Sequence, residues 1–264
     1  EPPQVGQATY YPNSDIHLKI KDFSANTIDL IYTSPPYGIT SAEWDKPLRW
    51  DELFKEMWRV LKPNGVIVLH ASIPFTYELL KYQTPKYHYS WLKTVATNFL
   101  AAKFQPLRIN EEVLVYYKKR GTYNPQMKGD KVYKSKEKNM GGGEDYYSTK
   151  CRSYISSDQV GNHPNTGLTY PTRRNGKGIN RPDELIDFFI KTYSNQGDTV
   201  LDMTCCNTIC GNAVVALNRN YIGVDIREIA QIEKNWNWFY KYWEGNLPKM
   251  ETTTTYDDVL ADKR

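Results

Sequence analysis

The sequence predicts an α/β protein with a largely parallel sheet. Apolar, β-branched runs alternate with segments whose apolar residues recur in helical rhythm, and the clearest of these runs lie at 28–33, 66–69, 199–202 and 221–225. A strand, a helix and a second buried strand in succession form a right-handed parallel unit. With 264 residues, of which 40% are hydrophobic, the chain can bury a full core.

The first third of the chain contains three strong local signals. Residues 1–14 carry three prolines and are expected to be an extended lead-in, after which Asp15 is a suitable N-cap for a helix over 16–23. A second helix is expected over 48–61, and Lys62-Pro63-Asn64-Gly65 ends it and turns the chain into the next strand. Further expected elements are a helix over 75–82 and strands over 89–94 and 112–117.

The last third repeats the alternation of helix and strand. Pro182 and the two acids after it suit the first turn of a helix. Gly197-Asp198 then turns the chain into a buried strand. The elements expected after that turn are the strand 199–202, a helix over 212–217, the strand 221–225 and an aromatic-rich helix over 228–243.

The apolar run 28–33 ends in the tetrapeptide Ser34-Pro35-Pro36-Tyr37. The two prolines stiffen this loop, and open α/β sheets bind ligands at the carboxyl ends of their parallel strands. Ser34 and the prolyl carbonyls can accept hydrogen bonds from an exocyclic amine, while Tyr37 can stack on a flat ring. The loop is therefore a candidate site for an aminated base, and the alternative is a Pro-Pro turn with an incidental tyrosine.

A second candidate site follows the strand 199–202. The next strand ends in Asp225, about 20 residues after the loop that contains Cys206 and Thr208. A strand, a loop, a helix and a strand that ends in an acid hold a nucleoside cofactor, with the acid on the ribose hydroxyls. Such a loop needs glycines for close approach, and this one has none before Gly211.

The composition changes between residues 118 and 177. Lysines and arginines are interleaved with tyrosines around Gly141-Gly142-Gly143, and apolar periodicity is lost. Such an insert suits contact with nucleic-acid backbone and bases, although a solvated surface loop is the alternative. The net charge is only +4, so partners must be inferred from where the charges lie.

The sequence also argues against several classes of protein. No apolar stretch approaches the roughly 18 residues that a membrane span needs, so we expect an intracellular protein. Cys205, Cys206 and Cys210 crowd one loop and Cys151 stands apart, which is a poor pattern for a disulfide or a zinc site. We therefore expect no metal.

Together these segments resemble the DNA amino-methyltransferases that modify adenine N6 or cytosine N4, in particular phage- and virus-type enzymes with the β-class motif order. In that order the catalytic loop precedes the target-recognition region and the cofactor loop comes last. The resemblance covers about residues 13–225. It rests on segments 29–38, 44–45, 62–65, 74–76, 106–108, 123–126, 197–202 and 218–225.

The resemblance implies a Rossmann-like, S-adenosylmethionine-dependent methyltransferase fold: a mixed, mostly parallel seven-stranded sheet with helices on both faces, plus the basic insert. The implied domains are a catalytic half over 1–117, a target-recognition insert over 118–177, a cofactor-binding half over 178–245 and a polar tail over 246–264. The implied partner is DNA, in methylation of the restriction–modification kind. A homodimer or a partner subunit is left open.

The resemblance also implies roles for single residues. A flipped-out base would be held by Ser34, Pro35, Pro36 and Tyr37, and S-adenosylmethionine by Asp15, Asp202, Thr204, Cys206, Thr208 and Asp225. Nucleic-acid contacts are expected from Trp44, Lys128, Lys131, Lys134, Arg173 and Arg174. Structural alternatives are a helix cap for Asp15 and a strand-end turn for Asp202.

The chain departs from the family pattern at two places that affect function. Serine at position 34, where many adenine enzymes carry aspartate, slightly favours a cytosine target, although the overall likeness is to adenine enzymes. Cys206 and Thr208 occupy the two glycine positions of the cofactor loop. The main alternative is therefore a nucleic-acid-binding protein or subunit that no longer binds cofactor, and a weaker one is methylation of an RNA base.

Overall fold

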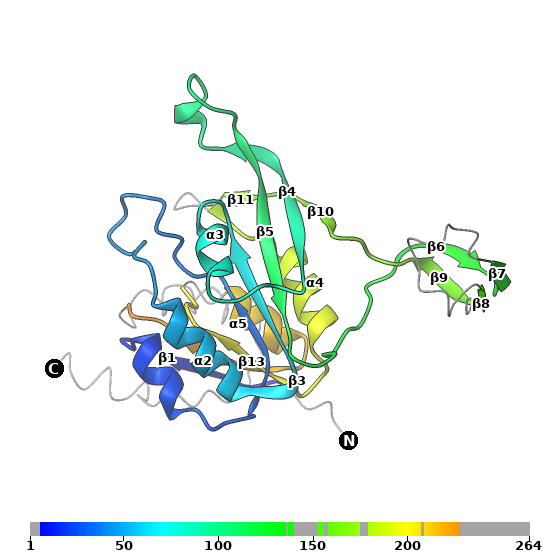
Figure 1. Cartoon of the computed structure of the whole chain (residues 1–264), viewed down its shortest axis with the longest axis horizontal. Helices are drawn as coiled ribbons and strands as arrows, with labels where there is room; N and C mark the ends of the chain where they lie inside the picture. Colours follow the sequence, from blue (N-terminus) through cyan, green and yellow to red (C-terminus); the bar gives the residue numbers. More distant parts are fainter. Residues whose placement is uncertain are drawn as a thin grey trace, which may run out of the picture. The chain divides into compact units, whose positions relative to one another are not determined.

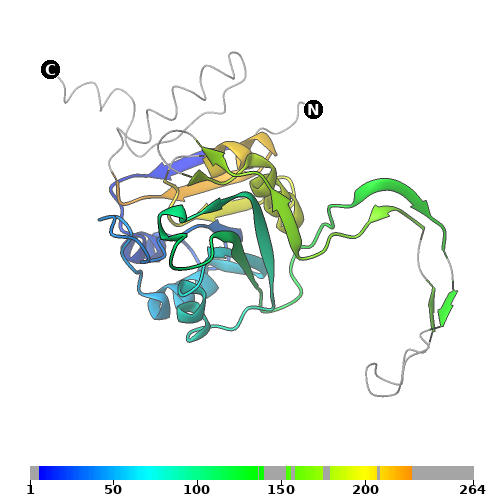
Figure 2. The same cartoon turned by 90° about the horizontal axis from the view of Figure 1, so that it is seen from above.

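The computed structural model describes residues 6–135, 137–139, 153–155, 158–174, 179–206 and 209–227. The chain divides into a larger unit, Glu1–Asn124 with Thr166–Arg264, and a smaller unit, Pro125–Asn165. Both are drawn in Figure 1, and again from above in Figure 2. No helix of the described residues is long and apolar enough to cross a membrane.

An eight-stranded sheet runs through the larger unit in the order β1-β14-β13-β2-β3-β5-β4-β10. Its strands are β1 (Ala8–Tyr11), β2 (Ile28–Thr33), β3 (Leu61–Ala71), β4 (Tyr87–Thr97), β5 (Arg108–Tyr116), β10 (Gly167–Tyr170), β13 (Thr199–Asp202) and β14 (Asn220–Val224). Neighbouring strands are parallel except in the two pairs that involve β5. The expected α/β architecture is confirmed, with one strand more than the seven expected, because β10 pairs with the outer edge of β4.

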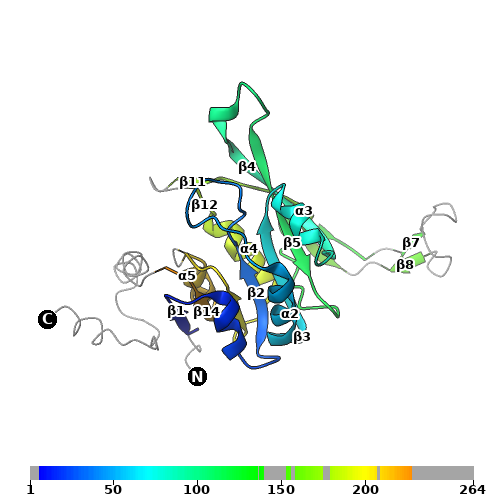
Figure 3. The ribbon, with the colours of Figure 1, turned by 60° about the vertical axis from the view of Figure 1, so that its left-hand side comes forward.

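Two groups of helices cover opposite faces of this sheet (Figure 3). The helices are α1 (Ile16–Lys19), continued by the 3-10 turn η1 (Ile20–Asp22), then α2 (Trp50–Val60), α3 (Phe75–Leu80), α4 (Asp183–Tyr193) and α5 (Ile209–Ala216). Residues of α4 and α5 join one buried cluster, and residues of α1, α2 and α3 join the other. The larger unit therefore has three layers.

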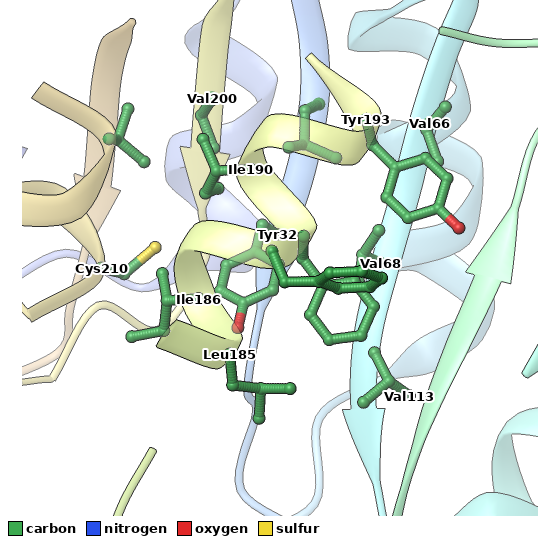
Figure 4. Close-up of a cluster of buried hydrophobic side chains, with 14 of the residues drawn as sticks. Tyr32, Val66, Val68, Val113, Leu185, Ile186, Ile190, Tyr193, Val200 and Cys210 are labelled. Atoms are coloured by element: carbon green, nitrogen blue, oxygen red, sulfur yellow. The ribbon is translucent and has the colours of Figure 1, made fainter. Parts of the chain in front are cut away.

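Strand alternation explains why the two clusters are separate. Leu30 and Tyr32 belong to the cluster under α4, whereas Ile31 between them belongs to the cluster under α2. Figure 4 shows the first cluster, in which Ile186 and Ile190 of α4 lie over the strands. Strands buried on both faces are continuous apolar runs, which is why the sequence revealed them so clearly.

The strands β1, β2, β13 and β14 all end at the same side of the sheet, here called the carboxyl edge. β4 and β5 extend past that edge as a long hairpin whose tip contains the 3-10 turn η2 (Phe99–Ala101) (Figures 1 and 3). This length was not predicted, since only 89–94 and 112–117 were expected as strands. It also missed β1, because an edge strand among prolines looks like an extended lead-in.

The smaller unit contains two short antiparallel ladders. β6 (Lys128–Tyr133) pairs with β9 (Gln159–Asn162), and β7 (Glu137–Asn139) pairs with β8 (Ser153–Ile155). It lies within the insert expected over 118–177, but residues 166–174 belong to the larger unit, as does the ladder of β11 (Arg173–Arg174) with β12 (Ile179–Asn180). The helix expected over 228–243 lies outside the described residues.

Candidate active site

The proline loop leaves β2 at the carboxyl edge, next to the loop that follows β13. The Thr33 hydroxyl donates a hydrogen bond of 2.8 Å to Oδ1 of Asp202 and lies 3.0 Å from the Thr204 hydroxyl. β2 and β13 are adjacent and parallel, so these contacts join the ends of neighbouring strands. The two segments expected to hold base and cofactor therefore meet at one edge.

Tyr37 is partly buried, and both its ring and its hydroxyl contact other side chains. Its ring stacks on Phe75 of α3, with centroids 5.2 Å apart and planes 18° apart. Its hydroxyl donates to Oε1 of Glu111 at 2.9 Å and accepts from Nη2 of Arg181 at 2.9 Å. Ser34 also hydrogen-bonds the phenol, whose pKa is raised well above 10 by burial and by the Glu111 carboxylate. Since Phe75 covers one ring face, only the opposite face can take a base.

Glu111 of β5 is the centre of a buried charged cluster at this edge. Its Oε1 lies 2.7 Å from Nη2 of Arg181 and 3.3 Å from Nδ1 of His70, and its Oε2 lies 3.1 Å from Nζ of Lys93. Lys93, Glu111 and His70 belong to the adjacent strands β4, β5 and β3. We call Glu111, Arg181, Lys93 and His70 the Glu111 hub. It connects the hairpin strands to the hydroxyl of Tyr37.

The charges of the hub set the protonation of its members. Burial opposes ionisation of Glu111, but Arg181, His70 and Lys93 outweigh it and hold the pKa of that carboxyl well below 4.5. Burial, reinforced by Arg181, lowers the pKa of His70 to about 4, so its imidazole is neutral at pH 7. Its Nε2 lies 2.9 Å from the hydroxyl of buried Tyr32, consistent with a proton on Nδ1 facing Glu111.

Asp45 holds the loop that follows Tyr37. Its buried carboxylate accepts backbone N–H bonds from Gly38 at 2.7 Å, Ile39 at 3.0 Å and Thr40 at 2.7 Å. Gly38 has φ of +66°, a conformation that other residues rarely adopt. Trp44, expected to contact nucleic acid, is 67% exposed and so is available for a partner.

Asp202 is buried among internal partners. It accepts hydrogen bonds from Thr33, from the Thr204 backbone at 3.2 Å and from the Tyr221 hydroxyl at 3.2 Å. Burial raises its pKa to about 6 despite these bonds. Within the described structure, Asp202 therefore shapes the loop after β13. This is the strand-end turn that was the structural alternative for Asp202.

Asp225 follows β14 and faces the same loop. Its Oδ2 accepts from the Cys206 backbone at 2.7 Å and from Nη2 of Arg227 at 2.8 Å, while Oδ1 accepts from Nε and the backbone N–H of Arg227, each at 2.9 Å. A carboxylate has about four acceptor sites, so Arg227 and Cys206 fill them. Arg227 itself stays partly exposed.

Cys206 adopts φ of +50°, the left-handed conformation for which glycine is suited. The position that holds glycine in the family pattern therefore keeps the glycine backbone here while carrying a side chain. Thr208 at the second such position lies outside the described residues. The Cys206 side chain is exposed and its thiol is free.

Asp15 caps α1 by accepting from the His17 backbone at 2.8 Å, which confirms its structural role. Its neighbour Ser14 lies at the end of β14, because the Ser14 backbone donates to the Asp225 carbonyl at 2.9 Å. The cap and a cofactor contact are compatible, since a carboxylate has further acceptor sites. A cofactor contact of Asp15 stays a prediction.

The expected nucleic-acid residues lie in separate parts of the structure. Lys128, Lys131 and Lys134 are exposed in the smaller unit, where Lys134 pairs with Asp158 at 3.5 Å. Arg173 and Arg174 form β11 of the larger unit, and their side chains lie outside what the structure describes. Among the described residues, no group of three or more His, Cys, Asp or Glu side chains could hold a metal ion.

Sequence reasoning missed the Glu111 hub and the role of Asp45. The available signals were the acidic pair Glu111-Glu112 at the start of the strand expected over 112–117, and a histidine at the end of the apolar run 66–69. A charged or polar residue in a strand buried on both faces needs a partner. The sequence could have marked Glu111 and His70 as requiring partners, but it could not identify Arg181.

Sequence comparison matches this chain to a protein family and to individual relatives. The DNA methylase family profile, N6_N4_Mtase, matches residues 28–234. The chain is 26% identical over 224 residues to the type II methyltransferase M.HpaI of Haemophilus parainfluenzae, covering 79% of this chain and 67% of that protein. It is 26% identical over 244 residues to the DNA adenine methyltransferase YhdJ of Escherichia coli (strain K12), covering 86% and 81%.

Solved structures share the fold. The cytosine-N4-specific PvuII DNA methyltransferase superposes with a TM-score of 0.61 at 14% identity, covering 93% of this chain and 90% of that one. The complex of M1.HpyAVI with SAM superposes with a TM-score of 0.56 at 18% identity, covering 88% and 98%. From the profile match over most of its length, the chain belongs to the N6/N4 DNA methylase family.

Proposed function

We propose that this protein transfers a methyl group from S-adenosylmethionine to the exocyclic amine of a base turned out of a DNA duplex. The observation that carries the proposal is the contact of Thr33 with Asp202 and Thr204, which sets the proline loop against the loop after β13. A methyl donor and a nucleophilic amine must meet within bond-forming distance, and this edge brings their two candidate sites together.

The residues present fit a nucleoside cofactor after one side-chain movement. Asp225 ends the strand next to β13, and the Cys206 backbone beside it follows a glycine-like path that permits close approach. The ribose hydroxyls would take the acceptor sites that Arg227 now fills. Asp15 and Thr204 would supply further contacts. When bound, S-adenosylmethionine supplies an electrophilic methyl carbon on a positively charged sulfur.

The protein's own residues would act on the base by holding it. The Ser34 hydroxyl has one proton and two lone pairs, so it can donate to Tyr37 and still accept from the base amine. The Pro35 carbonyl would accept the second amine hydrogen, which directs the nitrogen lone pair toward the methyl group. Tyr37 would stack on the base with the ring face opposite Phe75.

The target base is the finer part of this proposal. Ser34 is uncharged, whereas an aspartate in its place would attract an amine with partial positive charge more strongly. We propose cytosine N4 as the target on this ground. Adenine N6 is the alternative, because one relative by sequence is an adenine methyltransferase, whereas one structural neighbour is cytosine-N4-specific. The two are separated by digesting the methylated DNA to nucleosides and identifying the modified base by mass spectrometry.

Transfer of labelled methyl from S-adenosylmethionine to unmethylated genomic DNA tests the proposed activity, because such DNA offers every short recognition sequence. We expect incorporation with the unaltered protein and a strong loss with Tyr37→Ala. Stacking of a base on an aromatic side chain contributes about 1 to 3 kcal/mol, so the loss should be about 5- to 160-fold. No incorporation into duplex or single-stranded DNA, together with no cofactor binding by calorimetry, would refute the proposal.

A second candidate function is supported by the same loop. Arg227 fills the acceptor sites of Asp225, and Cys206 holds a side chain where glycine is expected, so the chain could bind nucleic acid without a cofactor. This candidate predicts salt-dependent DNA binding with no affinity for S-adenosylmethionine, and some affinity after Cys206→Gly with Thr208→Gly. Micromolar cofactor binding by the unaltered protein would exclude it.

A further inference from the structure

The tip of the β4–β5 hairpin, residues 98–107, exposes large apolar side chains. Phe99 is 69% exposed, Leu100 92% and Phe104 88%. Leu92 and Val95 of β4 and Ile109 of β5 are 39%, 45% and 49% exposed, so apolar exposure along the hairpin is greatest at the tip. Exposed apolar groups gathered at one place on a protein indicate a contact surface.

The tip has its own ordered backbone. Asn98 takes a left-handed conformation with φ of +65°, and the chain then forms a short turn with bonds from the Ala101 backbone to Asn98 at 3.1 Å and from Phe104 to Ala101 at 2.9 Å. The Gln105 backbone also donates to the Ala101 carbonyl at 3.0 Å. These bonds present the apolar side chains on a defined scaffold.

The tip projects from the edge that carries the proline loop. Thr33 at the end of β2 is in register with Leu69 of β3, and Leu69 is in register with Leu114 of β5. From Leu114, β5 continues for six residues past this point to Arg108. At about 3.3 Å per residue, the tip lies roughly 20 Å past the end of β2. Whatever the tip contacts is therefore on the same side of the sheet as the candidate active site.

The charge around the tip is of one sign. Residues 92–110 contain no aspartate or glutamate, whereas Lys103 is exposed at the tip and Arg108 stands at its base. Glu111, the first acid beyond, is paired within its hub. Apolar side chains beside cations, without acids, complement a polyanion whose bases offer apolar faces.

We propose that the hairpin tip is a wedge that inserts Phe99, Leu100 or Phe104 between base pairs of duplex DNA. The major groove admits a two-stranded β-ribbon, and apolar side chains inserted between base steps unstack and kink DNA. The inference rests on the proposed function, because DNA held at the carboxyl edge is what brings a duplex to the tip. Unstacking lowers the cost of turning out a base.

A second copy of this chain is the competing occupant, and the area argues against it. Three side chains of this size could bury at most about 450 to 750 Å², from the 150 to 250 Å² that one aromatic side chain can bury, and they are only 69% to 92% exposed. Stable interfaces bury about 800 Å² per partner. The tip is large enough to enter a base stack and too small to hold a dimer by itself.

The test uses the full chain and a readout that needs no methyl transfer. A nicked plasmid is sealed by ligase in the presence of the protein, and the topoisomers are compared after the protein is removed, because insertion between base pairs unwinds the duplex. We expect a shift with the unaltered protein and its loss with Phe99→Ala combined with Phe104→Ala, with duplex affinity reduced about 5- to 160-fold. Leu18→Ala, which removes a 66% exposed side chain from α1, is the control and should keep the shift.

Methyl transfer to native and to heat-denatured DNA separates the two proposals. The tip variant should lose transfer to native DNA and keep transfer to denatured DNA, which has no stack to open. The wedge is overturned if the tip variant still shifts the topoisomers. It is also overturned if sedimentation shows a dimer for the unaltered protein and a monomer for a tip variant that keeps the shift. A tip-dependent shift in a protein that transfers no methyl group supports the wedge and overturns the proposed function.

Discussion

Replacing Glu111 by glutamine tests whether the hub sets the position of Tyr37. The carboxylate faces Arg181 at 2.7 Å and Lys93 at 3.1 Å, and all three side chains are largely buried. Removing one partner of a buried charge pair costs about 3 to 5 kcal/mol, and the lower end applies because the amide oxygen still accepts a hydrogen bond. We expect the free energy of unfolding, measured with urea, to fall by about 3 kcal/mol.

The catalytic consequence follows from the lost acceptor of the Tyr37 hydroxyl. A displacement of about 1 Å in a binding loop can reduce a rate about 100-fold, so the single-turnover rate of methyl transfer should fall about 10- to 100-fold. Affinity for S-adenosylmethionine should be unchanged, because the hub does not contact Asp225 or Cys206 in the described structure.

Glu112→Gln is the matched control for Glu111→Gln. Glu112 is the next residue and accepts from the Thr76 hydroxyl at 3.1 Å and the Asn110 amide at 3.3 Å, without a cation. Its substitution should cost less than about 1 kcal/mol, the usual contribution of a hydrogen bond. Equal losses in the two variants, or an unchanged stability and rate in Glu111→Gln, would refute the role given to the hub.

Three further predictions follow from the site. Arg227→Ala removes the two side-chain bonds to Asp225 and keeps the backbone bond, so calorimetry should show tighter binding of S-adenosylmethionine than in the unaltered protein. Weaker binding would show that Arg227 itself holds the cofactor. Burial lowers the pKa of His70 to about 4, so the stability that its neutral form contributes above pH 6.5 is lost as the pH falls toward 4. In urea titrations, His70→Gln should remove about 3 kcal/mol of this pH dependence. Asp202, whose pKa is raised to about 6, contributes with the opposite sign in both proteins. Asp45→Asn leaves fewer acceptors for three backbone N–H groups, so hydrogen exchange of residues 38–40 should accelerate while exchange in the sheet stays unchanged.

The sequence was sufficient to predict the features that depend on the local pattern of residues. Strands buried on both faces are continuous apolar runs, and the strand 199–202 was expected with the bounds that β13 has. The contact of the proline loop with the loop after β13 also followed, because parallel strands end at one edge. Local signals fix which segments are strands and where their ends point.

Contacts between segments far apart in the sequence could not be predicted from it. The bond from Arg181 to Glu111 joins residues 70 positions apart, and β10 pairs with β4 although the smaller unit, Pro125–Asn165, lies between them in the sequence. Both depend on tertiary packing rather than on propensity. The positive φ of Cys206 is a third case, since only the backbone path shows that a glycine position kept its conformation without its glycine.

The attachment of the smaller unit has a consequence for how this protein can diverge. Just before that unit, the Asn124 backbone donates to Thr192 of α4 at 2.8 Å, and just after it the Ser90 backbone donates to the Thr166 carbonyl at 2.8 Å. Both junctions are thus secured on the larger unit, and the entropy of closing a loop grows slowly with its length. Segments of other sizes can therefore be exchanged at this position without dismantling the sheet.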